Sequence, residues 1–272
     1  MLPESTDTPG IEPASVEPVP APSPELPDES AQSLAPQPVM VREPFWHYSD
    51  VVLFVGLSLA ALIAIGIFIR LFSGGKVLQN PPSTLLLILQ LLLYVVFYGV
   101  GRLIFALRYN KPLFASLGWR RTHFNLAVTA LSGAALAFLV SLIASALKTP
   151  KITTPIDQLV DSRFSFVLFA ITAIVVAPFF EEFLFRGLLQ PLFSRTFGLL
   201  AGILLTAALF GFAHGYEYAW AWQYILAIFI AGAAFGIARA RANSIVPPVI
   251  MHCCYNTVFL IAFAVTKHGK FS

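Results

Sequence analysis

Long apolar stretches separated by short polar turns dominate the chain after residue 46. A helix needs about 20 mostly apolar residues to cross the hydrocarbon core of a bilayer. The pattern predicts seven such helices, at residues 51–71, 84–107, 124–147, 164–194, 198–214, 222–239 and 246–266. The fourth is long enough to leave eight as an alternative, and Pro191 is expected to kink its end. We therefore expect an all-α, polytopic transmembrane helical bundle of about seven to eight helices.

The composition supports a membrane location. Hydrophobic residues make up 57% of the chain and charged residues only 11%, whereas a soluble domain carries roughly a quarter charged residues. The basic residues stand singly in short loops, which is typical of helix ends facing anionic lipid and argues against a nucleic-acid partner. They divide almost evenly between the two membrane sides, so the orientation is not predicted.

Three regions follow from these patterns. Residues 1–45 contain 11 of the 20 prolines and eight of the 14 acidic residues, which predicts a disordered tail that serves as a tether or an interaction segment. Residues 46–122 hold the first two membrane helices, and residues 123–272 hold the other five. Trp46 and His47 are interpreted as an interfacial anchor. The two cysteines are adjacent, Cys253 and Cys254, so no disulfide framework is expected.

Ionisable residues inside apolar segments are costly and point to function. The first group is Glu181, Glu182 and Arg186. Glu182 precedes Arg186 by four residues, which favours an ion pair along a helix. Glu181 points about 100° away from that pair, and an unpaired carboxylate in an apolar segment suits a general base. The alternative is a charged cluster at a helix end in the headgroup region.

Two further groups follow along the chain: His214 ends the fifth predicted helix, and His252 and Asn256 share one face of the seventh. Each has a structural alternative, because His214 can be interfacial and Asn256 can simply join two helices. Together with Glu181 they are the parts of a hydrolytic site. The carboxylate can take a proton from water while imidazoles hold that water or the oxyanion. Equally, Glu181, His214 and His252 can ligate Zn²⁺.

Helix arithmetic tests whether these groups can meet. Glu182 and His214 lie ~22 and ~25 Å from a turn near Phe197, and therefore at similar depth. His252 lies only ~14 Å beyond its own turn near Asn243. His252 and Asn256 are therefore expected to match the depth of Glu182 and His214 less well, unless the fourth and fifth helices protrude from the bilayer.

The order of these motifs resembles the CPBP family, which comprises CAAX proteases and bacteriocin-processing proteins. The family pattern is E-E-x-x-x-R, then F-x-x-x-H, then H-x-x-x-N/D, and residues 181–186, 210–214 and 252–256 match it without a departure. Each motif alone is weak, but all three in order on apolar segments are specific. The resemblance covers roughly residues 130–266.

The resemblance implies an intramembrane endopeptidase with a conical cavity that opens toward one membrane face. Glu181 would activate the attacking water, and His214 would help to hold it. His252 and Asn256 would stabilise the oxyanion, while the neighbouring Glu182–Arg186 pair would brace the site. The family is commonly classed as metalloproteases, so a zinc enzyme and a metal-free glutamate protease both remain open.

The expected partners are a protein or peptide substrate at the membrane and the lipid bilayer. CAAX-type and bacteriocin-type processing are both consistent with the resemblance, and the compact spans and short loops favour a bacterial inner (cell) membrane. One alternative is a non-catalytic scaffold or immunity protein, which the Pro-rich tail supports because such tails recruit partners. Another is an ion-coupled transporter, against which stands the lack of internal repeats in the sequence.

Overall fold

The described residues of the computed structural model are 44–73, 79, 81–152 and 159–266, and they all belong to one unit that spans residues 39–272. The predicted tail lies outside the described residues, except for Pro44 and Phe45.

All regular secondary structure in the described residues is helical, as predicted. The elements before the long central stretch are α1 (Tyr48–Ser73), α3 (Ser83–Tyr109), α4 (Leu113–Ser116) and α5 (Leu126–Ala146). The central stretch consists of α7 (Arg163–Ile171), η2 (Thr172–Val176), α8 (Ala177–Glu182), η3 (Phe183–Leu189) and α9 (Gln190–Phe197). After it come α10 (Leu199–Ala213), η4 (Tyr216–Tyr218), α11 (Trp222–Ala242) and α12 (Val246–Thr266).

Six of the described helices are long and apolar enough to cross a membrane, and the stretch from α7 to α9 counts as one of them with 35 residues. The fifth predicted helix, α10, is not among these six and has only 15 residues. At 1.5 Å per residue it is ~22 Å long, shorter than the ~30 Å hydrocarbon core. The chain is thus an integral multi-pass membrane protein.

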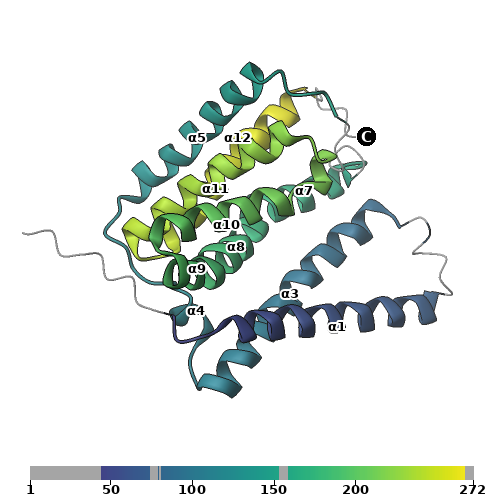
Figure 1. Cartoon of the computed structure of the whole chain (residues 1–272). Coiled ribbons are helices and arrows are strands. Elements are labelled where there is room, and N and C mark those ends of the chain that lie inside the picture. Colours follow the sequence, from purple (N-terminus) through teal and green to yellow (C-terminus); the bar gives the residue numbers. More distant parts are fainter. Residues whose placement is uncertain (1–43, 74–78, 80, 153–158, 267–272) are drawn as a thin grey trace, which may run out of the picture. The chain divides into compact units, whose positions relative to one another are not determined.

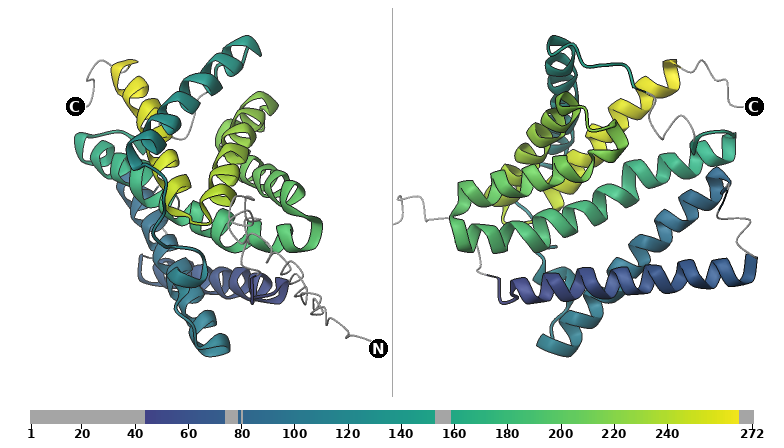
Figure 2. Two further views of the ribbon diagram at one scale, coloured as in Figure 1. Left: turned by 90° about the vertical axis from the view of Figure 1, so that its left-hand side faces the viewer. Right: turned by 45° about the vertical axis from the view of Figure 1, so that its right-hand side comes forward.

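Helix packing brings distant segments of the chain together. Helix α12 packs against α5 and α11, and α10 packs against α9 and α11 (Figure 1). Helices α1 and α3 form a second pair, and α3 also contacts α7 (Figure 2). These contacts place the three elements that carry the sequence motifs, α8 with η3, α10 and α12, next to one another.

The long central stretch contains two π-helical segments, η2 and η3, and each is soon followed by a proline. Pro178 and Pro191 lack an N–H, so the carbonyl four residues earlier loses its helical partner. The wider π turn accommodates this loss without ending the helix. Before Pro191, where the sequence predicts a kink, the structure therefore has a π segment within a continuous helical run. Neighbouring carbonyls in these segments accept side-chain donors, Ala173 from Asn256 and Leu188 from Trp46.

Candidate active site

Three of the predicted site residues converge, although they come from three different helices. Glu181 lies on α8, His214 caps the end of α10, and His252 lies on α12. The Oε2 atom of Glu181 is 3.9 Å from Nε2 of His214 and 3.8 Å from Nε2 of His252. The side chains of Glu181 and His214 are 22% and 19% exposed, while that of His252 is only 4% exposed. Glu181 and His214 therefore form the open side of the site.

The second nitrogen of each imidazole is held by an oxygen. Nδ1 of His214 is 2.8 Å from the Phe210 carbonyl, and Nδ1 of His252 is 3.0 Å from Oε1 of Glu182. Because a carbonyl and a carboxylate only accept, Nδ1 donates in both rings. In a neutral ring, Nε2 then presents a lone pair toward Glu181. Three acceptor atoms thus surround one point, and a water bound there can donate its two hydrogens to two of them.

Behind this group lies a buried ion pair. Glu182 and Arg186 are both fully buried, and their Oε1 and Nη1 atoms are 2.8 Å apart, which confirms the predicted pairing. Arg186 also donates to the Gly232 carbonyl of α11. Since Oε1 of Glu182 also accepts from His252, this carboxylate links α8 to α12 and orients the His252 ring.

Aromatic rings enclose the buried part of the site. Phe210 was predicted to pack beside His214, and their ring centroids are 4.7 Å apart. Its ring also lies 4.4 Å from the Arg186 guanidinium carbon, in a cation–π arrangement. Phe235 of α11 stacks on the His252 ring with centroids 4.8 Å apart. The sequence did not single out Phe235, because one phenylalanine among 25 carries no distinguishing pattern.

Asn256 occupies a different position from the convergent group. Its amide donates to the Ala173 carbonyl in η2 at 2.8 Å, so it joins α12 to the π segment. This is the interhelical contact that the sequence left open as an alternative. The oxyanion role of Asn256 stays a prediction.

The two turns from which the depths of His252 and His214 were counted, α11–α12 and α9–α10, differ in exposure. The turn between α11 and α12 is buried, because Ser244 donates to the Arg120 carbonyl and the Ile245 N–H to that of Gly118. The turn between α9 and α10 is open, with Phe197 57% and Leu199 47% exposed. The α9–α10 turn is therefore the more exposed of the two, and protrusion of the fourth and fifth helices from the bilayer stays a prediction.

Glu217 is a third acid near the site, after Glu181 and Glu182. It lies on η4, in the loop after His214, and the residue as a whole is exposed. Burial of its carboxyl by surrounding protein raises the pKa of Glu217, an effect that His214 opposes and Glu181 reinforces. A lone acid in a loop gives no sequence signal for this proximity, which depends on the turn that follows α10.

The donor set Glu181, His214 and His252 was also predicted as a zinc site. Its chemistry suits zinc, since two imidazole nitrogens and a carboxylate are common ligands and both imidazoles are oriented by second-shell oxygens. Across the described part of the chain, however, no group of three or more His, Cys, Asp or Glu side chains is arranged as a metal site. We therefore derive no step through a metal, and the zinc set stays a prediction.

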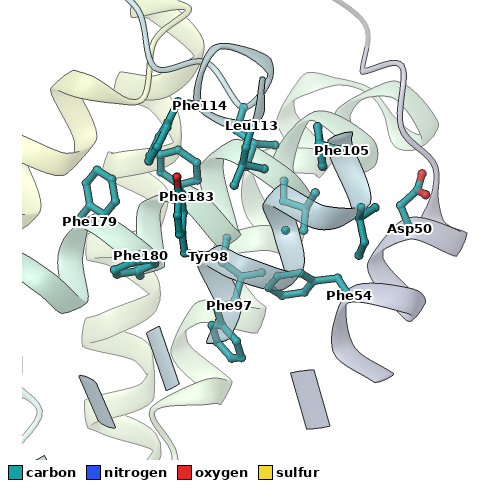
Figure 3. A pocket seen from close by; sticks show the side chains of 15 residues that line it. Asp50, Phe54, Phe97, Tyr98, Phe105, Leu113, Phe114, Phe179, Phe180 and Phe183 are labelled. Carbon is teal, nitrogen blue, oxygen red and sulfur yellow. The ribbon is translucent and has the colours of Figure 1, made fainter. Parts of the chain in front are cut away.

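An apolar pocket lies beside the motif helix. It encloses about 560 Å³ and is lined by side chains of α1, α3, α4, α8 and η3, among them Phe114, Phe180 and Phe183 (Figure 3). None of the six predicted site residues lines it. Phe180 and Phe183 nevertheless flank the two glutamates in sequence, so the pocket and the site share one helix. The expected conical cavity is not seen as a pocket around Glu181.

Comparison with known proteins adds one finding. Residues 163–258 match the family model described as type II CAAX prenyl endopeptidase Rce1-like, a segment that runs from α7 into α12 and includes all six predicted site residues. The match covers less than half of the chain and is narrower than the predicted 130–266, since it leaves out α5. No curated protein and no solved structure matches the chain. With its motifs in order and brought together by the fold, the segment of residues 163–258 is similar to the type II CAAX prenyl endopeptidase Rce1-like family.

Proposed function

We propose that the chain is an intramembrane endopeptidase that hydrolyses peptide bonds of a membrane-associated protein or peptide, with Glu181 as the general base. The observation that carries the proposal is the convergence of Glu181 with His214 and His252 at 3.8–3.9 Å. The family match supports peptidase chemistry.

The reaction needs a water bound between the three side chains. Glu181 takes one proton of this water as its oxygen bonds to the scissile carbonyl carbon. The carbonyl becomes an oxyanion, and an N–H on Nε2 of a protonated His252 can donate to it. When the tetrahedral intermediate collapses, the C–N bond breaks and Glu181 returns its proton to the leaving amine.

The buried residues hold this arrangement in place. Glu182 accepts from Nδ1 of His252 and so fixes the direction of Nε2. Arg186 balances the charge of Glu182, and both side chains are fully buried. The apolar pocket beside α8 can accept an apolar group of the substrate, which is consistent with a lipidated or membrane-embedded chain.

The direct test replaces Glu181 with Gln, which keeps the shape of the side chain but removes the base. We expect cleavage to fall at least ~100-fold, the usual contribution of a general base. Because Glu181 is partly exposed and has no direct hydrogen bond to the buried pair, the thermal unfolding temperature should stay close to that of the unmodified protein. A Glu181→Gln protein that cleaves a CAAX-type or bacteriocin-type membrane peptide at the original rate would falsify the proposal.

Metal dependence gives a second prediction. In the metal-free mechanism, incubation of the purified protein with a strong chelator leaves kcat and KM unchanged, and elemental analysis finds substoichiometric zinc. Loss of activity on chelation that only Zn²⁺ restores would instead establish the zinc set Glu181, His214 and His252. A zinc protease used in parallel under the same conditions controls for incomplete chelation.

The cellular setting and the substrate belong to the same proposal. Six membrane-spanning helices joined by short loops favour a bacterial inner membrane, with the substrate a prenylated-type or bacteriocin-type peptide. If the Glu181→Gln protein is folded and still performs the cellular role of the unmodified chain, a scaffold function would replace the peptidase.

A further inference from the structure

A run of polar residues extends the motif beyond the part that the proposed mechanism uses. Glu182, Arg186, Gln190 and Ser194 follow one another at intervals of four along α8, η3 and α9. Side chains four apart in a helix lie on the same face, about 5–6 Å from each other. The first three are buried and Ser194 is partly buried. The run therefore leads from the candidate site to the turn between α9 and α10.

The facing helix, α11, anchors this run through its backbone. Arg186 donates to the Gly232 carbonyl at 2.8 Å, and Gln190 donates to the Gly236 carbonyl at 3.0 Å. The two glycines are also four residues apart, so the contacts repeat along the interface. Beyond them, Arg239 continues the same side of α11 and is only 7% exposed. We call these five polar side chains, Glu182, Arg186, Gln190, Ser194 and Arg239, the polar seam.

Each member of the polar seam keeps one polar atom that has no hydrogen-bond partner within the described residues. These atoms are Glu182 Oε2, Arg186 Nε, Gln190 Oε1, Ser194 Oγ and Arg239 Nε. A buried polar atom without a partner costs about 1–3 kcal/mol. Five such atoms in one seam would be a heavy penalty for a folded protein, so the seam requires a shared ligand.

The donor and acceptor types identify that ligand as water. Two of the atoms are guanidinium donors, two are carboxylate or amide acceptors, and the Ser194 hydroxyl can do either. An anion would be attracted by the arginines but repelled by Glu182 Oε2 and Gln190 Oε1. A water that bridges two atoms at about 2.8 Å each, at its near-tetrahedral angle, joins atoms about 4.5 Å apart, which flexible side chains whose Cβ atoms lie about 5–6 Å apart can supply.

A small pocket marks where the water enters. It has room for about one water molecule and is lined by four members of the seam together with Pro191, Leu199 and Ala240. Leu199 is 47% exposed at the α9–α10 turn. The opening is therefore at the end of the seam that is farthest from Glu182.

We propose that the polar seam binds ordered water in this pocket, between the α9–α10 turn and Arg186 behind the candidate site. This water completes the hydrogen bonds of the buried charges and brings solvent to the rear of a site that hydrolyses peptides. Its use in hydrolysis rests on the proposed function, but the binding of water does not.

X-ray radiolytic labelling of the full chain in lipid nanodiscs tests the proposal, because radicals formed from bound water modify the side chains beside it. Pro191 lines the pocket and is buried, whereas its neighbour Leu192 is fully buried and does not line it. We expect Pro191 to be labelled clearly above Leu192. Equal background labelling of Pro191 and Leu192 in the unmodified protein would overturn the proposal, independently of the results for the variants.

A pair of variants tests the seam itself. Gln190→Leu removes the central acceptor at nearly constant size, and the labelling of Pro191 should fall to the level of Leu192. Thr206→Val is the matched control, because this buried hydroxyl of α10 bonds to the Gly202 carbonyl of its own helix. In Thr206→Val, Pro191 should be labelled as strongly as in the unmodified protein. Unchanged labelling in Gln190→Leu would contradict the proposal.

Activity separates this proposal from the proposed function. Labelling needs no cleavage. A protein in which Pro191 is labelled but which has no peptidase activity would contradict the proposed function and still support the bound water. If both hold, Gln190→Leu should lower kcat with little change in KM, while Thr206→Val should change neither.

Discussion

Glu182 forms two contacts through a single atom, and that makes it the residue on which the candidate site depends structurally. Oε1 is 2.8 Å from Arg186 and 3.0 Å from His252. The neighbouring Glu181 has no such contact at hydrogen-bond distance, and its side chain is partly exposed. Two adjacent glutamates therefore have different surroundings, one buried and paired and one partly exposed, because a step of one residue turns a helix by about 100°.

The first residue-scale prediction concerns Glu182→Gln. Removing the negative charge leaves Arg186 buried without its counter-ion, and breaking a buried pair in this way costs about 3–5 kcal/mol. Unfolding of the purified protein in detergent should therefore occur at a clearly lower temperature, in contrast to Glu181→Gln.

A double variant controls for this effect. Glu182→Met combined with Arg186→Met removes both charges, so it should recover part of the lost stability while remaining inactive. If Glu182→Gln alone unfolds at the temperature of the unmodified protein, the Glu182–Arg186 pair does not contribute the stability that its burial predicts.

At the scale of elements, the close packing of α5 on α12 sets the position of His252. Gly133 of α5 faces the backbone of Met251, the residue before His252, and a Cβ on Gly133 would lie 2.2 Å from the Met251 carbonyl oxygen. No Cβ fits there, so the two helices approach more closely than any other residue would allow. The family match begins after α5, yet this helix positions a site residue.

We therefore predict that Gly133→Ala destabilises the protein and lowers its activity, because α12 must move away from α5. Gly99→Ala is the control, since nothing lies within 4 Å of a Cβ at Gly99 in α3. Alanine is favoured over glycine in a helix by up to about 1 kcal/mol, so this control should be neutral or more stable. Thermal unfolding of both variants checks the prediction, and equal behaviour of the two would argue against the close approach.

The elements themselves were largely predictable. The predicted boundaries of the membrane helices agree with the structure to within three residues, for example 246–266 for α12 and 222–239 against 222–242 for α11. The length of an apolar run is a local property, so a sequence carries it directly. The π segments η2 and η3 were not predicted. They arise where prolines meet side-chain donors from distant parts of the chain, Asn256 and Trp46.

At the scale of the whole described unit, the segment before α1 packs against the helix that carries Arg186 and Gln190. Trp46 was interpreted as an interfacial anchor, but it is only 3% exposed and donates to the Leu188 carbonyl at 3.1 Å. Leu188 lies in η3, between Arg186 and Gln190. The segment that precedes α1 thus docks on the motif helix through the indole N–H, which donates to a backbone carbonyl.

Trp46→Phe removes this hydrogen bond and leaves the Leu188 carbonyl without its donor. The expected loss is about 1–3 kcal/mol of unfolding free energy, with a fall in cleavage because η3 also holds Arg186. Trp119→Phe serves as the control, since Trp119 is 39% exposed. Denaturant unfolding of both variants gives the comparison, and a Trp46→Phe protein as stable as the control would contradict the docking.

The sequence by itself determined the membrane helices and the chemical set of the site. Apolar length and the spacing of Glu182 and Arg186 are local properties of a helix, and they hold before any tertiary contact forms. The tertiary structure alone decided that Glu181, His214 and His252 meet, that Asn256 bonds to Ala173 and that Trp46 reaches Leu188. The physical reason is that the distance between side chains on separate helices depends on the rotation, tilt and depth of each helix. Those quantities are set by close contacts such as Gly133 against Met251, which no local pattern of residues contains.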